Sequence, residues 1–208
     1  MTSTETKASR PTIIGHFSHS FVELDDPERW TFFVSHSDHT VRRLVVFVHG
    51  FRGESVGTWL DFPLIDAGRP ENLWWAESDL LFIGYDSIKE NIAGVANRIR
   101  RNLPRFYPSL FADVMKICDC PARSDISTPY EELYLVGHSL GGVILRRVLS
   151  DVAQQWLDSG GSEIDKPALL DANARLFSPA SAGFEPSGWL GLLRATGIWD
   201  RMIEIILP

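Results

Sequence analysis

Long apolar runs and cysteine are both scarce in this 208-residue sequence, and each shortage excludes a class of protein. No apolar stretch reaches the roughly 20 residues of a membrane-spanning helix, and the polar residues 1–10 lack the apolar core of a signal peptide. The two cysteines, Cys118 and Cys120, are spaced unlike zinc knuckles or redox pairs. We therefore interpret the cysteines as loop thiols and expect a cytoplasmic protein with no transmembrane segment.

Positive charge is also in deficit, because 20 lysines and arginines face 27 aspartates and glutamates, a formal net charge of −7. A surface of this sign repels phosphate backbones, so we expect no nucleic-acid partner. The length and the 44% hydrophobic content favour one domain with a substantial core. The composition predicts a disordered tail over residues 1–11 and a single domain over residues 12–208.

Short apolar runs alternate with segments of helical periodicity along the chain. A turn-like Asp25-Asp26-Pro27 separates two leading strands, which predicts a hairpin. The expected strands cover residues 12–24, 30–34, 44–48, 80–83, 133–136 and 174–177, and the expected helices cover residues 88–103 and 140–156. This alternation predicts an α/β fold, with a mostly parallel sheet and helices on both faces.

A G-H-S-L-G-G motif at residues 137–142 lies directly between a predicted strand and a predicted helix. This context is the one that a G-x-S-x-G turn requires to present a nucleophilic serine, here Ser139. Gly137 and Gly141 would allow close packing around it, and the helix N-terminus would favour a developing anion. The alternative is a glycine-rich turn with an incidental serine, which the strand before and the helix after disfavour.

A second glycine-bearing loop, V-H-G-F-R-G at residues 48–53, follows the buried strand at residues 44–48. Acyl transfer needs two N–H donors for the oxyanion, one after the nucleophile and one after an earlier strand. We expect the amides of Leu140 and Phe51 to be these oxyanion-hole donors, with Gly50 allowing a close approach. We interpret His49 as a structural residue that orients this loop.

Taken together, V-F-V-H-G-F (residues 46–51), T-W (58–59), G-Y-D-S (84–87) and G-H-S-L-G-G (137–142) resemble the lipase-like serine esterases of the α/β-hydrolase superfamily. The sequence is most similar to the branch related to serine-active-site-containing proteins and GPI inositol deacylases, over residues 44–152. The resemblance implies a hydrolase fold, a serine nucleophile, a small-molecule or lipid ester substrate, and no metal or organic cofactor.

The family order of serine, acid and histidine breaks down because no histidine follows Ser139. The resemblance places His36 and His39 at the end of the sheet opposite the serine, and it places His16 and His19 on a surface edge strand. His138 precedes the sharp turn and would point away from the serine. A serine without a base is a weak nucleophile.

The acid is equally unassigned. Some lipases carry it in a D-P-A sequence after the next strand, where this chain reads F-S-P-A with Ser178 at the acid position. We interpret Asp86, which follows its own strand, as structural. The acidic residues after Ser139 are Asp151, Asp158, Glu163, Asp165, Asp171, Glu185, Asp200 and Glu204.

Residues 188–207 are apolar and resemble a cap segment that precedes the last strands of the family fold. We therefore expect a chain without those strands, able to self-associate through an exposed C-terminal edge. The favoured function is cleavage of a carboxylic ester through an acyl-enzyme on Ser139. The alternatives are an inactive hydrolase-fold binding or effector module, and a histidine supplied by a partner chain. Whether this chain by itself is an enzyme stays open.

Overall fold

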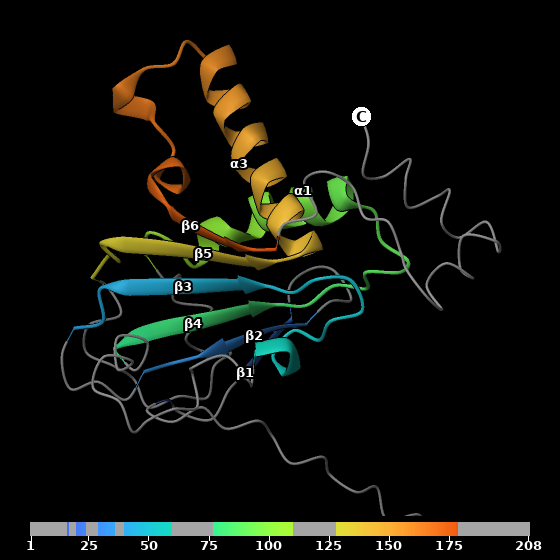
Figure 1. The fold of residues 1–208 in the computed structure, drawn as a ribbon. Helices are drawn as coiled ribbons and strands as arrows, with labels where there is room; N and C mark the ends of the chain where they lie inside the picture. Colours follow the sequence, from blue (N-terminus) through green and yellow to red (C-terminus); the bar gives the residue numbers. More distant parts are fainter. Residues whose placement is uncertain are drawn as a thin grey trace, which may run out of the picture.

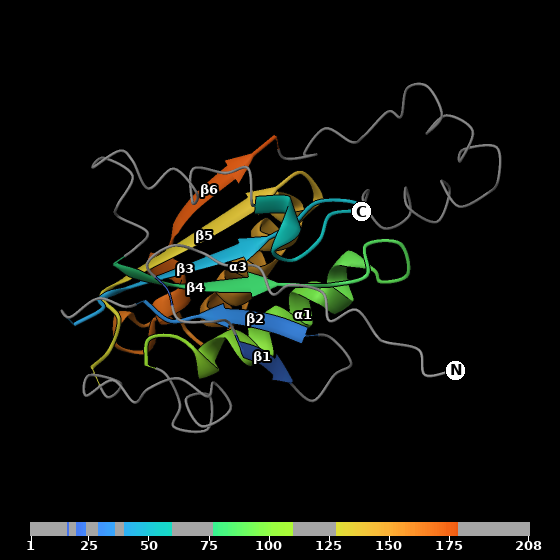
Figure 2. The same ribbon diagram turned by 90° about the horizontal axis from the view of Figure 1, so that it is seen from below.

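The computed structural model describes residues 16, 20–23, 29–35, 40–59, 77–109 and 128–178. Within them lies one six-stranded sheet, in the order β1-β2-β4-β3-β5-β6 (Figures 1 and 2). The strands are β1 Ser20–Glu23, β2 Arg29–Phe33, β3 Arg43–Val48, β4 Ser78–Ile83, β5 Glu132–His138 and β6 Asn173–Phe177. β4, β3, β5 and β6 are parallel, whereas β2 runs antiparallel to both β1 and β4. The predicted hairpin and mostly parallel sheet are confirmed.

Two α-helices, α1 Ile92–Asn102 and α3 Leu140–Asp158, pack against each other on one face of the sheet (Figure 1). The short 3-10 turn η1 Gly57–Trp59 lies against the opposite face, in front of the strands in Figure 2. Three further 3-10 turns are described: η3 Leu103–Arg105, η4 Glu163–Asp165 and η5 Ala168–Asp171. The predicted helix over residues 140–156 is confirmed and continues to residue 158.

The helix predicted over residues 88–103 begins four residues late, for a local reason. Side-chain oxygens capture the amides that the expected first turn would have used. The Asp86 carboxylate accepts hydrogen bonds from the amides of Ile88 and Lys89, which form a separate turn. Asn91 then caps α1, with its side-chain oxygen 2.6 Å from the amide nitrogen of Gly94.

The two central strands explain why the sheet is a rigid platform. All residues of β4 are buried, and β3 is buried beyond Arg43, as expected for parallel strands covered on both faces. On the side facing η1, the rings of Phe47 and Phe82 stack with centroids 4.7 Å apart. The helix side packs residues such as Leu135 and Ile144 into the larger core cluster. The loops at the strand ends are therefore held by packed neighbours.

The prediction of a surface position for His16 is wrong. His16 is 5% exposed, and its Nε2 lies 2.7 Å from the carbonyl oxygen of Ser78, at the amino end of β4. The residue also bridges to Ser35, so it closes the sheet at the end away from Ser139.

Some expectations fall outside the described residues. These are the tail over residues 1–11, Cys118 and Cys120, the histidines at positions 19, 36 and 39, and the apolar residues 188–207. Among the residues that are described, no helix has the length and apolar character to cross a membrane.

Candidate active site

Ser139 occupies a sharp turn between the end of β5 and the start of α3. Its backbone angles are φ 50° and ψ −117°, a conformation that a residue with a side chain adopts only under strain. A Cβ at Gly141 would lie 2.1 Å from the carbonyl oxygen of Val48, and one at Gly137 would lie 2.8 Å from the Cα of Gly142. The two glycines are therefore required for α3 to begin this close to β3 and β5.

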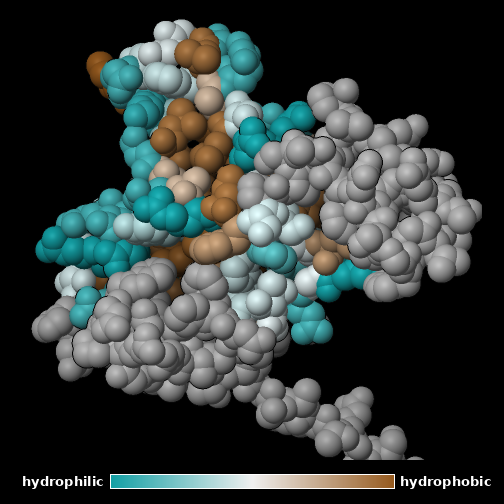
Figure 3. Space-filling model, in the orientation of Figure 1, coloured by the Kyte–Doolittle hydropathy of each residue, from teal (hydrophilic) through white to brown (hydrophobic). Residues whose placement is uncertain are grey.

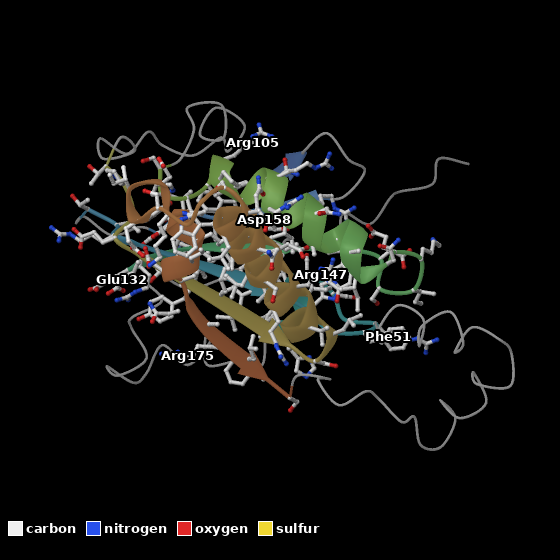
Figure 4. The ribbon with its side chains drawn as sticks, turned by 90° about the horizontal axis from the view of Figure 1, so that it is seen from above. Phe51, Arg105, Glu132, Arg147, Asp158 and Arg175 are labelled. Carbon is white, nitrogen blue, oxygen red and sulfur yellow. The ribbon has the colours of Figure 1, made fainter. Side chains whose placement is uncertain are left out.

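The loop after β3 reaches the same turn. A Cβ at Gly50 would lie 2.9 Å from the Cβ of Ser139 and 3.0 Å from Nδ1 of His138. Phe51 follows Gly50 at the carboxyl end of the sheet, whereas Glu132 marks the opposite end (Figure 4). The structure thus brings together the three residues singled out from the sequence, Ser139, Leu140 and Phe51.

The backbone amides of Leu140 and Phe51 are the two donors expected to face the substrate. Leu140 is the first residue of α3, where the helix geometry leaves N–H groups without an intrahelical acceptor. Across the described ranges, neither amide has a hydrogen-bond acceptor within the chain. An oxyanion hole requires N–H donors of this kind, and the Leu140 amide also lies at the positive end of α3.

His49 is buried inside the loop after β3, and both of its ring nitrogens have backbone partners. Nδ1 lies 2.8 Å from the carbonyl oxygen of Gly50, and Nε2 lies 3.3 Å from the amide nitrogen of Tyr85. Burial lowers the pKa of His49 from its ordinary value of 6.5, so the ring is neutral at physiological pH. These contacts fit the structural role expected for His49, and they leave no nitrogen available as a base.

Tyr85 belongs to the G-Y-D-S motif, but the sequence assigned it no role. Its ring stacks on the ring of His49 with centroids 4.2 Å apart, and its hydroxyl donates to the carbonyl oxygen of His49 at 2.7 Å. Burial raises the pKa of Tyr85, which keeps the phenol protonated as a donor. The usable signal was its position two residues beyond β4, because β4 neighbours β3 in the sheet.

Arg52 and Ser87 join the loops after β3 and β4, and Asp86 orders the second of these loops. The Arg52 amide donates to Oγ of Ser87 at 2.7 Å, and Arg52 itself has a left-handed φ of 57°. The hydrogen bond from the Lys89 side chain, helped by the amide of Ile88, lowers the pKa of Asp86. Because its oxygens are used within its own turn, Asp86 has the structural role expected from the sequence.

The strand after α3 ends beside the serine. The amide of Ser139 donates to the carbonyl oxygen of Phe177 at 2.9 Å, which extends the β5–β6 ladder to the turn. Ser178 comes next, exposed and with a left-handed φ of 44°. The position where some lipases carry the acid is thus close to Ser139, but a hydroxyl there cannot supply a carboxylate.

The described acidic residues after Ser139 lie along α3 and the turns beyond it. Asp151 lies twelve residues after Ser139 along the helix, a distance of about 18 Å at 1.5 Å per residue. Asp151 is paired with Arg147, which Figure 4 shows on α3. Of the others, Asp158 accepts from Gln154, Asp171 pairs with Lys166, and Glu163 and Asp165 form η4, whereas Glu185, Asp200 and Glu204 lie outside the described residues.

No imidazole in the described ranges is hydrogen-bonded to the Ser139 hydroxyl. His16 lies at the other end of the sheet, and His49 is occupied on both nitrogens. His138 is exposed, and its ring lies against the glycine that Ser139 also contacts. The same ranges contain no group of three histidine, cysteine or acidic side chains placed to hold a metal ion.

No protein-family model and no curated protein sequence matches the chain. Solved structures do match. Two inhibited forms of esterase B from Lactobacillus rhamnosis each match 95% of this chain with a TM-score of 0.53, at 14% and 15% identity. The structure of the Francisella virulence factor BioJ matches 83% of this chain with a TM-score of 0.48 at 16% identity.

The chain spans only 60%, 59% and 46% of the lengths of these three solved chains. Identities this low are informative about architecture alone. The shared architecture is a mostly parallel sheet with helices. The chain therefore has an α/β-hydrolase fold.

Proposed function

We propose that the protein is a serine ester hydrolase whose nucleophile is Ser139. Oγ attacks the carbonyl carbon of a carboxylic ester while its proton passes to a base, and the alcohol leaves with a proton as the acyl-enzyme forms. Water then releases the acid and restores the serine. The amides of Leu140 and Phe51 stabilise the oxyanion of each tetrahedral intermediate.

The strained backbone of Ser139, packed closely against Gly50, is the observation that carries this proposal. Strain of this kind persists only where the surrounding structure enforces it, and it concentrates at functional sites. The esterase B neighbour supports the same chemistry, because it was solved with a tributyrin phosphonate as inhibitor. A short-chain carboxylic ester is accordingly the first substrate to test.

The decisive experiment compares hydrolysis of p-nitrophenyl butyrate by the wild-type chain, Ser139→Ala and Ser150→Ala. Ser150 is exposed on α3 and has no part in the site, so it controls for the substitution itself. We expect Ser150→Ala to match wild type and Ser139→Ala to lose about 1,000-fold or more in kcat. Equal rates in all three proteins would overturn the proposal for this chain.

The base is the part of the mechanism that the described residues leave unassigned. His138 is the first imidazole to test, because a Cβ at Gly50 would lie 3.0 Å from its Nδ1 and 2.9 Å from the Cβ of Ser139, which places both side chains beside Gly50. If turnover depends on Ser139, His138→Ala separates two sources of the base. Loss of turnover would assign the base to His138, whereas unchanged turnover would leave the other histidines of the chain or a histidine of a partner chain.

An inactive hydrolase-fold module is the second candidate, favoured by the occupied nitrogens of His49 and the hydroxyl at Ser178. Such a protein would bind an ester analogue without turning it over. Calorimetric titration with a non-hydrolysable butyryl analogue tests this directly. Binding of the analogue without Ser139-dependent turnover would show that the chain is an inactive hydrolase-fold binding module.

Self-association through the C-terminal edge of the sheet also stays a proposal. β6 is the last strand in the described sheet order, and Phe177 is 42% exposed on it. Apolar side chains also gather along α3 and the turns after it, where Leu157 is 59% and Ile164 is 94% exposed (Figure 3). Unpaired edges and apolar patches favour association. Sedimentation velocity over a range of concentrations should therefore show a dimer, and a monomer throughout would refute it.

A further inference from the structure

The peptide unit that joins Gly50 to Phe51 is fixed from its carbonyl side. The Gly50 oxygen lies 2.8 Å from Nδ1 of His49 and accepts the amide of Gly53 at 3.1 Å. A trans peptide is planar, with its C=O and N–H pointing in opposite directions. Two hydrogen bonds on the oxygen therefore set the direction of the Phe51 N–H, the second oxyanion donor of the proposed function.

The ring of His49 can make its contact in one tautomer only. The amide of Tyr85 can only donate, so Nε2, at 3.3 Å, must present its lone pair. The proton of the neutral ring is then on Nδ1, where it is needed to donate to the Gly50 oxygen. The opposite tautomer would place a proton against the Tyr85 amide and a lone pair against the Gly50 carbonyl.

Tyr85 also fixes the ring in space. Its aromatic ring stacks on the imidazole with an interplanar angle of 13°, and its hydroxyl donates to the carbonyl oxygen of His49 at 2.7 Å. The two side chains are 8% and 1% exposed, so water does not compete for these contacts. The end of β4 thereby holds the loop that follows β3.

We infer that His49 and Tyr85 are positioning residues: the Tyr85 amide selects the Nδ1-protonated tautomer of His49, and that proton aims the Phe51 amide through the Gly50 carbonyl. The inference rests on the proposed function for its catalytic meaning. Its geometric content stands independently, because the direction of an N–H bond can be measured without turnover. Neither residue touches the substrate.

The tautomer and the amide direction are tested first, by NMR of the isotope-labelled wild-type chain and two variants. In wild type we expect the proton of His49 on Nδ1 and an unprotonated Nε2. His49→Asn keeps a side-chain N–H donor near the Nδ1 position, whereas His49→Leu removes it. The residual dipolar coupling of the Phe51 amide should change in His49→Leu and stay close to wild type in His49→Asn.

The same pair of variants gives the catalytic test. A misdirected oxyanion donor weakens the transition state more than substrate binding, so His49→Leu should lower kcat by about 100-fold with KM changed by less than about 2-fold. His49→Asn should recover most of that loss. Tyr85→Phe, which removes only the hydroxyl, should give a smaller loss of kcat. Urea unfolding of each variant separates these effects from misfolding.

The outcomes distinguish this inference from the proposed function. A wild-type chain with no Ser139-dependent turnover defeats the proposed function, and the NMR results still decide the inference. A proton on Nε2 of His49, or an unchanged Phe51 coupling in His49→Leu, overturns the inference even in an active enzyme. Equal losses of kcat in the folded His49→Leu and His49→Asn proteins would overturn it as well.

Discussion

The two ends of the parallel sheet are built on opposite physical requirements. At the carboxyl end, neighbouring atoms approach Gly50 and Gly141 so closely that an added Cβ would clash with them, and Ser139 is held in a strained conformation. At the amino end, the buried carboxylate of Asp79 accepts the Ser35 amide at 2.9 Å and the Tyr130 hydroxyl at 2.5 Å. The carboxyl end cannot accommodate an added side-chain atom at these glycines, and the amino end loses buried hydrogen bonds if the Asp79 carboxylate is removed.

The difference teaches how to separate sites of chemistry from sites of stability in a single sheet. Both ends bury polar groups. At the amino end these groups satisfy one another, whereas at the carboxyl end the amides of Leu140 and Phe51 have no acceptor among the described residues. Satisfied polar clusters stabilise a fold, and strained, open ones indicate function. Four predictions test this contrast.

Gly141→Ala should have the largest effect on stability. Its Cβ would lie 2.1 Å from the Val48 oxygen, a backbone atom that cannot move without displacing β3 or α3. We expect a loss of about 3 kcal/mol in the free energy of unfolding, measured by urea denaturation. Gly94→Ala is the matched control in α1, because its Cβ would meet a side-chain atom, Asn91 Oδ1, and only at 3.2 Å. Similar stabilities for the two variants would show that the close backbone approach at Gly141 does not limit stability.

Asp79→Ala should give the next largest loss, at the other end of the sheet. It leaves the buried Ser35 amide and Tyr130 hydroxyl without this acceptor, which should cost about 2–3 kcal/mol. Asp79→Asn keeps one acceptor oxygen and should lose less. Urea midpoints measure both variants. A change in Ser139-dependent kcat without a loss of stability would reverse the assignment of this end to stability.

The sequence was sufficient for features that depend on neighbours along the chain. Periodicity located β3, β5 and α3, and the strand-turn-helix context led to Ser139 and Leu140. Contacts made across the sheet had no such local signal. Tyr85 and His49 are 36 residues apart and meet because β4 pairs with β3. The Phe177 carbonyl reaches Ser139 because β6 pairs with β5.

The start of α1 illustrates a second limit. Apolar spacing predicts that a helix exists, but side-chain oxygens decide where it begins, and Asp86 diverts two amides before Asn91 caps the first turn. His16 shows the same limit for burial. Its expected place on an edge strand predicted a surface position, but its ring lies beside the carbonyl of Ser78, 62 residues away in the sequence.

Mild acid should destabilise the carboxyl end through His49. Burial lowers its pKa in the folded protein below the 6.5 of the unfolded chain, although nearby Glu54 opposes the shift. Between these two pKa values the unfolded state binds the extra proton. Stability is therefore full above 6.5 and is lost as pH falls below it, by at most about 1.4 kcal/mol per pH unit for one proton.

Urea unfolding from about pH 5 to about pH 8 measures this effect, with His49→Asn as the control. The difference in stability between the two proteins should shrink as the pH falls, because the asparagine cannot be protonated. Parallel pH profiles would show that His49 carries no such shift, and with it that its ring is not held neutral by the fold.

The smallest effect should come from a polar contact at the amino end that is not buried. Arg42 reaches both oxygens of Glu131, at 2.8 and 3.1 Å, but the two side chains are 65% and 60% exposed. Water screens such a pair, so Arg42→Ala should cost about 0.5 kcal/mol or less. The Arg42 carbonyl, which accepts the amides of Glu131 and Glu132, is kept in the variant. Arg42→Ala could instead lower the free energy of unfolding as much as Asp79→Ala. The stability of the amino end would then come from hydrogen bonds whether or not they are buried.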